Sequence, residues 1–160
     1  MTEEQQLDPQ FLNVDPLRET YREAVTESPA VVESLQEHHT ALLCIDLQYL
    51  DAAPGHGVFA DAEKSGVPKE AQQYYFDRLE HMVLPNVRRL QDAFRERGLE
   101  VIHTRIQSLT RDGRDRSPGH KRLNLHAAPG SKEAEFLPEV APMDDEIVIN
   151  KTASGVFNAS

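Results

Sequence analysis

The sequence predicts an α/β fold with a mostly parallel sheet. Residues 41–45, ALLCI, form a continuous apolar run, which is typical of a parallel strand buried on both faces. A long amphipathic stretch over residues 68–97 separates this run from a second one at 99–105. Strand, helix and strand in that order indicate a βαβ unit, so we expect the C-terminal ends of the two strands at the same edge of the sheet.

An N-terminal arm with a short helix is expected over residues 1–39, and the folded domain over residues 40–160. The arm is rich in acids and prolines and has little apolar periodicity. Asp15 and Pro16 suit an N-cap and a first helical residue. Apolar residues then recur at helical spacing before Pro29.

A first strand over residues 41–45 ends at Asp46, and Pro68 then opens the long helix. We expect Pro85 to kink this helix and Gly98 to close it. The predicted apolar stripe consists of Tyr75, Leu79, Met82 or Val83, Val87, Leu90 and Phe94.

A second strand is predicted over residues 99–105, a short helix over 131–136 and a third strand over 146–151. Between them, residues 106–129 are basic and rich in turn-forming residues. Two interpretations of this loop remain open: a lid that contacts substrate, or a solvated loop whose arginines pair with acids of a partner subunit.

The charge balance excludes several classes of partner. The chain has 17 Lys and Arg against 27 Asp and Glu, a net charge of −10, which disfavours nucleic acid and anionic membranes. No apolar run is long enough for a membrane span, and the first residues lack a signal-peptide pattern. Cys44 is the single cysteine, which suits a reducing compartment. We therefore expect a cytoplasmic protein.

Polar groups follow the predicted strands at one edge of the sheet: Asp46, the run His103-Thr104-Arg105, and Lys151. Open α/β sheets bind ligands at that edge. A nucleophile placed between Asp46 and Lys151 would meet both a base and a cation. His103 is expected to be a packed core residue rather than a ligand, and Arg105 is the better candidate for binding a substrate carboxylate or carbonyl.

Two other classes of protein share part of this pattern. A phosphotransfer receiver domain has an Asp, a Thr and a Lys at its strand ends in the same order as Asp46, Thr104 and Lys151. Such a domain also needs an acidic pair at the end of an earlier strand to hold Mg²⁺, and this sequence has no such pair. A phosphatase of the haloacid dehalogenase type needs a second aspartate two residues after the first, where this chain has Gln48. The sequence therefore disfavours both.

Four short sequence motifs add to this pattern. They are ALLCIDLQYL (41–50), VIHTR (101–105), PGS with EFLPEVAP (129–131 and 135–142), and INKTASGVF (149–157). In this order they resemble the isochorismatase-like cysteine hydrolases, which include nicotinamidases, N-carbamoylsarcosine amidase, biuret hydrolase and ureidoacrylate amidohydrolase. The resemblance implies a Rossmann-like, three-layer α/β/α fold, incomplete in this chain, and hydrolysis of a C–N bond in a small amide or ureido compound.

The resemblance also implies roles for individual residues. Asp46 matches the carboxylate that takes the proton of a nucleophilic cysteine, and Lys151 matches the lysine that lowers the thiol pKa. Gln48 and Phe157 match residues that line the pocket, and Arg105 joins them as an expected substrate-binding residue.

The family's cysteine follows the lysine, whereas Cys44 precedes it and lies inside an apolar run that is typical of an inert core thiol. The sequence therefore predicts the N-terminal part of such a hydrolase, with the nucleophile outside this chain. A non-catalytic homologue that binds a small molecule or a protein is the alternative.

No metal site and no organic cofactor are expected. The metal-binding relatives use an Asp and histidines after the first strand, and this chain offers only Asp51, His56 and Asp61 there. The other histidines form no cluster by spacing. The expected partners are a small-molecule substrate, further copies of the chain in a homo-oligomer, or a second fragment of the same polypeptide.

Overall fold

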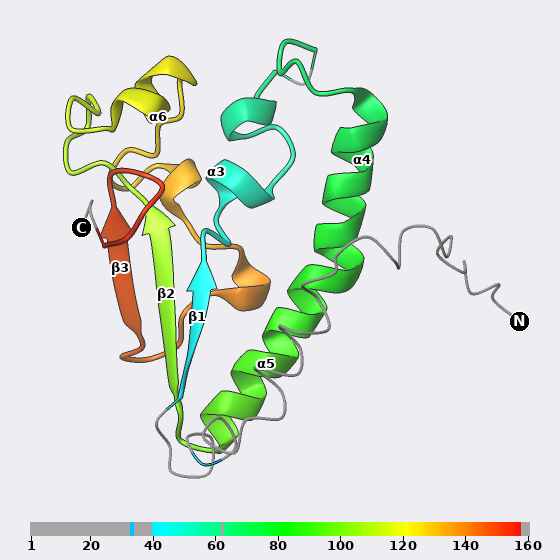
Figure 1. The fold of residues 1–160 in the computed structure, drawn as a ribbon, viewed down its shortest axis with the longest axis vertical. Helices are drawn as coiled ribbons and strands as arrows, with labels where there is room; N and C mark the ends of the chain where they lie inside the picture. Colours follow the sequence, from blue (N-terminus) through cyan, green and yellow to red (C-terminus); the bar gives the residue numbers. More distant parts are fainter. Residues whose placement is uncertain (1–32, 34–39, 62, 158–160) are drawn as a thin grey trace, which may run out of the picture. The chain divides into compact units, whose positions relative to one another are not determined.

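Three parallel strands form the sheet in the computed structural model, which describes residues 33, 40–61 and 63–157. Strands β1 (Ala41–Ile45), β2 (Glu100–Ile106) and β3 (Ile147–Lys151) lie side by side in the order β1-β2-β3 (Figure 1). Both pairings are parallel. The predicted α/β class and parallel sheet are confirmed, with strand bounds within one residue of those expected. Apart from Glu33, the predicted arm lies outside the described residues.

The long helix between β1 and β2 is interrupted by a π-helical turn. Helix α4 (Lys69–Arg78) leads into the π-turn η3 (Leu79–Val83), and α5 (Leu84–Glu96) follows. Proline has no N–H to donate to the preceding turn, so the ordinary hydrogen-bond ladder cannot continue through Pro85. The backbone N–H of Leu84 donates instead to the carbonyl of Leu79, five residues back.

The π-turn displaces the buried face of the helix by one residue. Before the turn, the residues turned inward are Gln72, Phe76 and Leu79; after it they are Leu84, Val87 and Gln91. The step of five between Leu79 and Leu84 follows from the extra residue in the turn. The predicted stripe is therefore wrong at Met82, Val83 and Leu90, which are exposed. It is also wrong at Tyr75, which lies before the turn and is 41% exposed.

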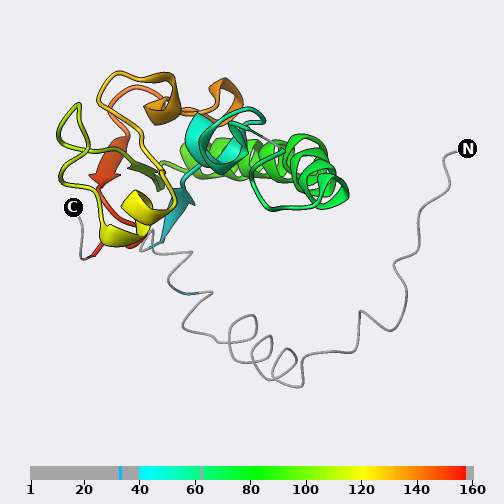
Figure 2. The same ribbon diagram turned by 90° about the horizontal axis from the view of Figure 1, so that it is seen from above.

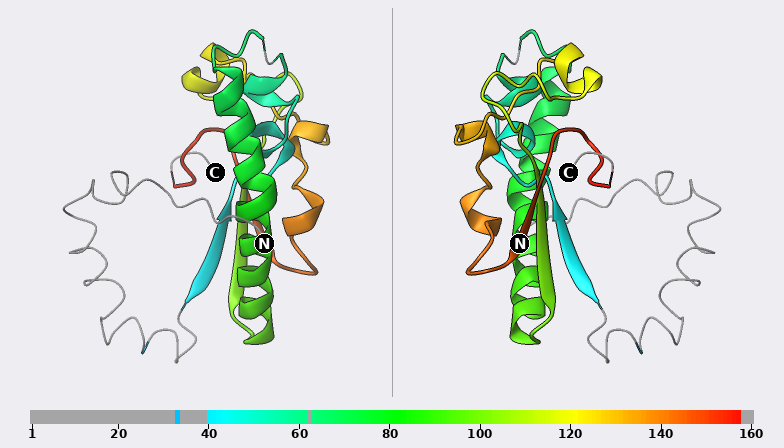
Figure 3. Two further views of the ribbon diagram at one scale, coloured as in Figure 1. Left: turned by 90° about the vertical axis from the view of Figure 1, so that its right-hand side faces the viewer. Right: turned by 90° about the vertical axis from the view of Figure 1, so that its left-hand side faces the viewer.

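The two faces of the sheet differ in cover. Helix α5 packs against β1 and β2 on the face that carries Cys44 and His103, and Gln91 Nε2 donates there to Cys44 Sγ at 3.5 Å. The segment of residues 132–140 lies toward the same side (Figure 3). On the opposite face, apolar side chains stay exposed in the described part of the chain, with Leu43 at 44% and Ile45 at 56%.

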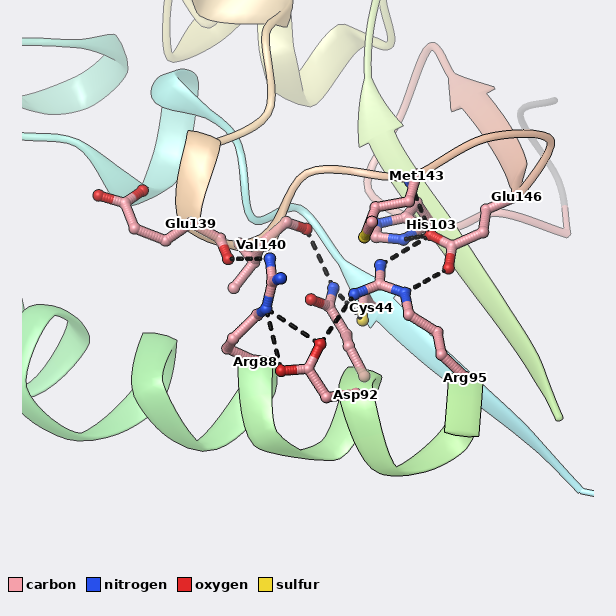
Figure 4. Close-up of polar contacts among 10 residues, drawn as sticks. Cys44, Arg88, Asp92, Arg95, His103, Glu139, Val140, Met143 and Glu146 are labelled. Atoms are coloured by element: carbon pink, nitrogen blue, oxygen red, sulfur yellow. Dashed lines mark hydrogen bonds and ion pairs between the residues drawn. The ribbon is translucent and has the colours of Figure 1, made fainter. Parts of the chain in front are cut away.

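A partly buried polar network ties α5 to the sheet (Figure 4). The Glu146 carboxylate accepts from Arg95 Nε at 2.7 Å, Arg95 Nη2 at 2.9 Å and the Met143 N–H at 3.0 Å. His103 Nε2 lies 3.0 Å from the same carboxylate, and the His103 side chain is fully buried. His103 is thus the packed core residue that the sequence predicts. The hydrogen bonds from Arg95, opposed in part by burial, lower the pKa of Glu146 to about 2.

Short elements fill the connections at the C-terminal ends of the strands. Helix α3 (Tyr49–Ala52) and turn η2 (Gly57–Phe59) follow β1, while turns η4 (Lys132–Ala134) and η5 (Pro138–Val140) precede β3. The helix expected over residues 131–136 is only the turn η4. The chain becomes extended at Glu135 and hydrogen-bonds there to Tyr49 N.

The basic loop contains a helix that the sequence analysis missed, α6 (Pro118–Arg122). The Ser117 hydroxyl caps it by accepting from His120 N at 3.2 Å. Two cations of the loop bind its own backbone, because Arg116 Nη1 donates to Leu125 O at 2.7 Å and Lys121 Nζ to Arg114 O at 2.6 Å. These contacts hold the loop together internally.

The helices of residues 40–61 and 63–157 include none with the length and apolar character needed to cross a membrane.

Replacing Glu146 by Gln should lower the free energy of unfolding by about 2 kcal/mol near pH 7, because the partly buried guanidinium of Arg95 loses its counter-charge. The pKa of Glu146 is lowered from 4.5 to about 2 on folding. Its stabilisation is therefore present above about pH 4.5 and lost as the pH falls toward 2. Urea unfolding followed by circular dichroism at several pH values measures the effect.

Glu139→Gln is the matched control for this variant, since the Glu139 side chain is exposed. It should change stability by less than about 0.5 kcal/mol. A difference between wild type and Glu146→Gln that stays constant down to pH 2.5 would contradict the assigned role.

Candidate active site

An ion pair joins the ends of two strands that are not neighbours in the sheet. Lys151 Nζ, at the end of β3, donates to Asp46 Oδ2, just after β1, at 2.7 Å. The Lys151 side chain is 1% exposed and that of Asp46 is 22% exposed. The two residues that the sequence singles out at the strand ends are therefore in direct contact, across the end of β2.

The backbone at Asp46 is bent to make this contact. Its φ of +55° lies in the left-handed region, which non-glycine residues adopt at a cost and which Asp tolerates better than most. Its N–H still donates to Thr104 O at 3.0 Å, so β1 remains bonded to β2 as the chain turns. Unusual backbone of this kind is concentrated at functional sites.

Gln48, just after β1, binds the end of β2 and turn η4 through its side chain. Its Nε2 donates to Ile106 O at 2.9 Å and to Glu133 O at 2.7 Å, and its Oε1 accepts from Ile106 N at 2.6 Å. The side chain is fully buried. Because its side-chain amide is hydrogen-bonded to backbone groups, Gln48 holds the backbone around the site and presents no free polar group to solvent.

His120 is a residue near the pair that the sequence analysis missed. Helix α6 carries it, and Figure 2, which looks onto the strand ends, shows α6 on the side away from α4. His120 Nε2 lies 3.2 Å from Ser154 Oγ, and Ser117 N donates to Thr152 O at 3.1 Å. Burial and the charge of Lys151 lower the pKa of His120. The Ser-Pro cap of α6 was the available signal.

Asp51, in α3, is a second carboxyl near the ion pair. Burial and the negative charge of Asp46, offset in part by Lys151, raise its pKa to about 6. Asp51 Oδ2 and Asp46 Oδ1 are both buried, and neither has a hydrogen-bond partner among the described residues. The sequence analysis considered Asp51 only as a metal ligand.

Arg105 and Phe157 do not join the pair. Arg105 Nε donates to Asn150 Oδ1 at 2.7 Å and its Nη1 to Ala134 O at 2.8 Å, and its guanidinium lies over the ring of Phe136. Strand alternation places Arg105 on the face opposite to Thr104. Phe157 is 94% exposed. Among the described residues, neither Arg105 nor Phe157 has a hydrogen bond or ion pair with Asp46 or Lys151.

Cys44 lies on the face of the sheet that α5 covers. It is 5% exposed, and burial raises the pKa of its thiol. Lys151 alternates with Asn150 and so shares the opposite face with Ile149, which pairs with Thr104. The thiol of Cys44 is thus a packed core group, as the sequence predicts, and points away from Lys151.

The described residues hold no group of three or more His, Cys, Asp or Glu side chains placed to bind a metal ion. Asp51, His56 and Asp61, which follow β1, do not gather into such a group; His56 Nδ1 lies instead 3.3 Å from Glu133 Oε1.

The fold and this site define a parallel α/β protein with an acid and a lysine at the ligand-binding edge of the sheet. The family model described as the isochorismatase domain matches residues 40–160. The chain belongs to the isochorismatase family.

Solved structures resemble the chain at low sequence identity. A cysteine hydrolase from Pseudomonas syringae pv. phaseolicola is 18% identical over 76% of this chain and 50% of its own, with a TM-score of 0.51. N-carbamoylsarcosine amidase from Thermoplasma acidophilum is 20% identical over 74% of this chain and 54% of its own, with a TM-score of 0.49. An isochorismatase family protein from Desulfovibrio vulgaris is 23% identical over 70% of this chain and 52% of its own, with a TM-score of 0.48. The chain spans about half the length of these structures. No curated protein sequence matches it.

Replacing Gln48 by Leu, which has nearly the same volume, should lower the free energy of unfolding by about 3 kcal/mol. The change leaves buried backbone groups of Ile106 and Glu133 without partners. Gln73→Leu, at an exposed position of α4, is the control and should change stability by less than about 0.5 kcal/mol. Equal stability of the Gln48→Leu protein and wild type would contradict this supporting role.

Proposed function

We propose that this chain supplies the acid and the lysine of a hydrolase that cleaves a C–N bond in a small amide or ureido compound. The observation that carries the proposal is the contact between Lys151 and Asp46 at the ligand-binding edge of a parallel sheet. Membership of the isochorismatase family supports a hydrolase role.

The nucleophile is a cysteine thiol supplied from outside residues 1–160. Two observations support this part of the proposal. Cys44 is buried on the face that α5 covers, while Lys151 lies on the opposite face. The matched cysteine hydrolase structure is covered over only 50% of its own length, so half of it has no counterpart here. Residues 40–160 would then be the N-terminal portion of the catalytic domain.

The exposed apolar side chains beside the site fit this arrangement. Leu43, Ile45 and Ile147 lie on the same face as Lys151 and are each more than two-fifths exposed. A further layer of polypeptide packed on this face would cover them and would bring its own side chains toward Lys151. The same layer would supply the thiol.

The reaction follows from the positions of these groups. Asp46 takes the thiol proton, and the ammonium of Lys151 favours the thiolate. The thiolate attacks the carbonyl carbon, and Lys151 stabilises the negative charge that develops on the oxygen. The C–N bond breaks and Asp46 returns the proton to the leaving amine. Water then cleaves the thioester, which releases the acid and regenerates the thiol.

Several expectations remain proposals. The proposed substrate is a small molecule. The proposed reaction uses no organic cofactor and no metal ion. The homo-oligomeric state and the cytoplasmic location stay predictions. Gln48 acts through the backbone it holds, and we do not carry Arg105 or Phe157 forward as substrate contacts.

Lys151→Ala in the complete protein should lower kcat/KM by roughly 10³-fold or more, because the cation acts mainly on the thiolate and the developing oxyanion. Ammonia release from nicotinamide, acetamide, biuret and N-carbamoylglycine measures the activity. Lys69→Ala, at an exposed lysine, should retain wild-type turnover. Turnover within a factor of three of wild type for Lys151→Ala would overturn the catalytic assignment. A wild-type protein that binds these compounds without releasing ammonia would favour the non-catalytic homologue.

Cys44→Ser should leave turnover unchanged in the same assay, because the Cys44 thiol packs against Gln91 in the core. Circular dichroism confirms that the variant is folded. Loss of activity in a folded Cys44→Ser protein would show that Cys44 is the nucleophile after all.

A further inference from the structure

Among the described residues, Asp51 is an acid that interacts electrostatically with the ion pair and that the proposed reaction does not use. Helix α3 begins directly after Gln48, whose amide fixes the chain there, and Tyr75 Oη donates to the Asp51 carbonyl at 3.1 Å. The short helix is therefore held from α4 and from η4. These two hydrogen bonds fix the backbone that carries Asp51.

The carboxyl group of Asp51 lacks a hydrogen-bond donor. Its Oδ2 is buried and has no partner in the described part of the chain, while the residue as a whole stays partly exposed. Buried carboxylate oxygens are normally hydrogen-bonded. Asp46 Oδ1 is also buried without a hydrogen-bond partner among the described residues, since Lys151 Nζ donates only to Oδ2 of Asp46. Asp46 and Asp51, five positions apart in the sequence, thus both offer acceptors that the described residues do not fill.

Two basic side chains of the described residues near α3 have acidic partners of their own. Lys132 Nζ donates to Glu135 Oε2 at 2.6 Å and lies over the ring of Tyr49. His56 pairs with Glu133. Lys151 is the cation whose charge acts on Asp51, and its ammonium is already bonded to Asp46 and to Ala153 O. In the described part of the chain, Asp46 Oδ1 and Asp51 Oδ2 are thus acceptors without a donor, which favours a ligand that donates hydrogen bonds.

We infer that Asp51 is a specificity-determining residue that accepts a hydrogen bond from an N–H of the substrate. The inference rests on the proposed hydrolase function and narrows its substrate class. The substrate carries at least one N–H on the nitrogen side of its carbonyl, as a primary amide or a ureide does. Lys151 meets the carbonyl oxygen and Asp51 meets the nitrogen. An ester, whose oxygen cannot donate, gains nothing from Asp51.

Amide and ester pairs with the same acyl group test this inference. The probes are nicotinamide with methyl nicotinate and acetamide with methyl acetate, and kcat/KM is measured on the complete protein. Asp51→Leu should lower kcat/KM for the amide by about 10- to 100-fold, the value of a hydrogen bond to a charged acceptor. The methyl ester should change by less than about threefold. Asp51→Asn, which keeps the shape and one acceptor oxygen, should show a smaller loss in the same direction.

Asp77→Leu, at an exposed position of α4, is the matched control and should alter neither substrate. Circular dichroism verifies the fold of each variant, and Asp51→Asn carries the test if Asp51→Leu does not fold. An equal loss for amide and ester, or no loss for the amide, would overturn the role of Asp51 and leave the proposed function intact. A wild-type protein that hydrolyses neither member of any pair would contradict the proposed function itself, and this inference with it.

Discussion

The contact between Lys151 and Asp46 is the interaction on which the rest of the site depends. It joins residues that are 105 positions apart in the chain and that end the two outer strands. The register of the sheet makes it reachable, because Lys151 pairs with Ile106 at the very end of β2. A shift of one residue in β3 would turn Lys151 to the other face. The parallel pairing of β2 and β3 therefore determines whether the acid and the lysine meet.

Burying an ammonium group is expensive, and a buried ion pair is poor evidence for stability. The structure keeps this pair beside an apolar sheet face and bends the backbone at Asp46 to do so. A core of apolar side chains would fold at lower cost. The proposed chemistry accounts for the arrangement, because a thiol placed near a carboxylate and an ammonium becomes a nucleophile at neutral pH. The Glu146 network on the opposite face has the structural role instead.

The strands and their edge could be predicted because continuous apolar runs and the residues that end them are local signals. The buried face of the long helix could not, since the π-turn before Pro85 changes its register and no periodicity reports an inserted residue. The backbone contacts of Gln48 and Arg105 could not be predicted, because sequence does not show which backbone carbonyls a side chain reaches. His120 was missed because a loop of about twenty residues brings it back to the strand ends, and only its Ser-Pro cap was visible.

Alkylation under native conditions tests the central claim most directly. The purified protein is treated briefly with iodoacetamide, and intact masses and peptides of every polypeptide present are determined. The account predicts one rapid adduct, on a cysteine outside residues 1–160, formed more slowly in the Lys151→Ala protein because the ammonium no longer favours the thiolate. An adduct on Cys44, or the absence of any rapid adduct in a folded and complete protein, would contradict it.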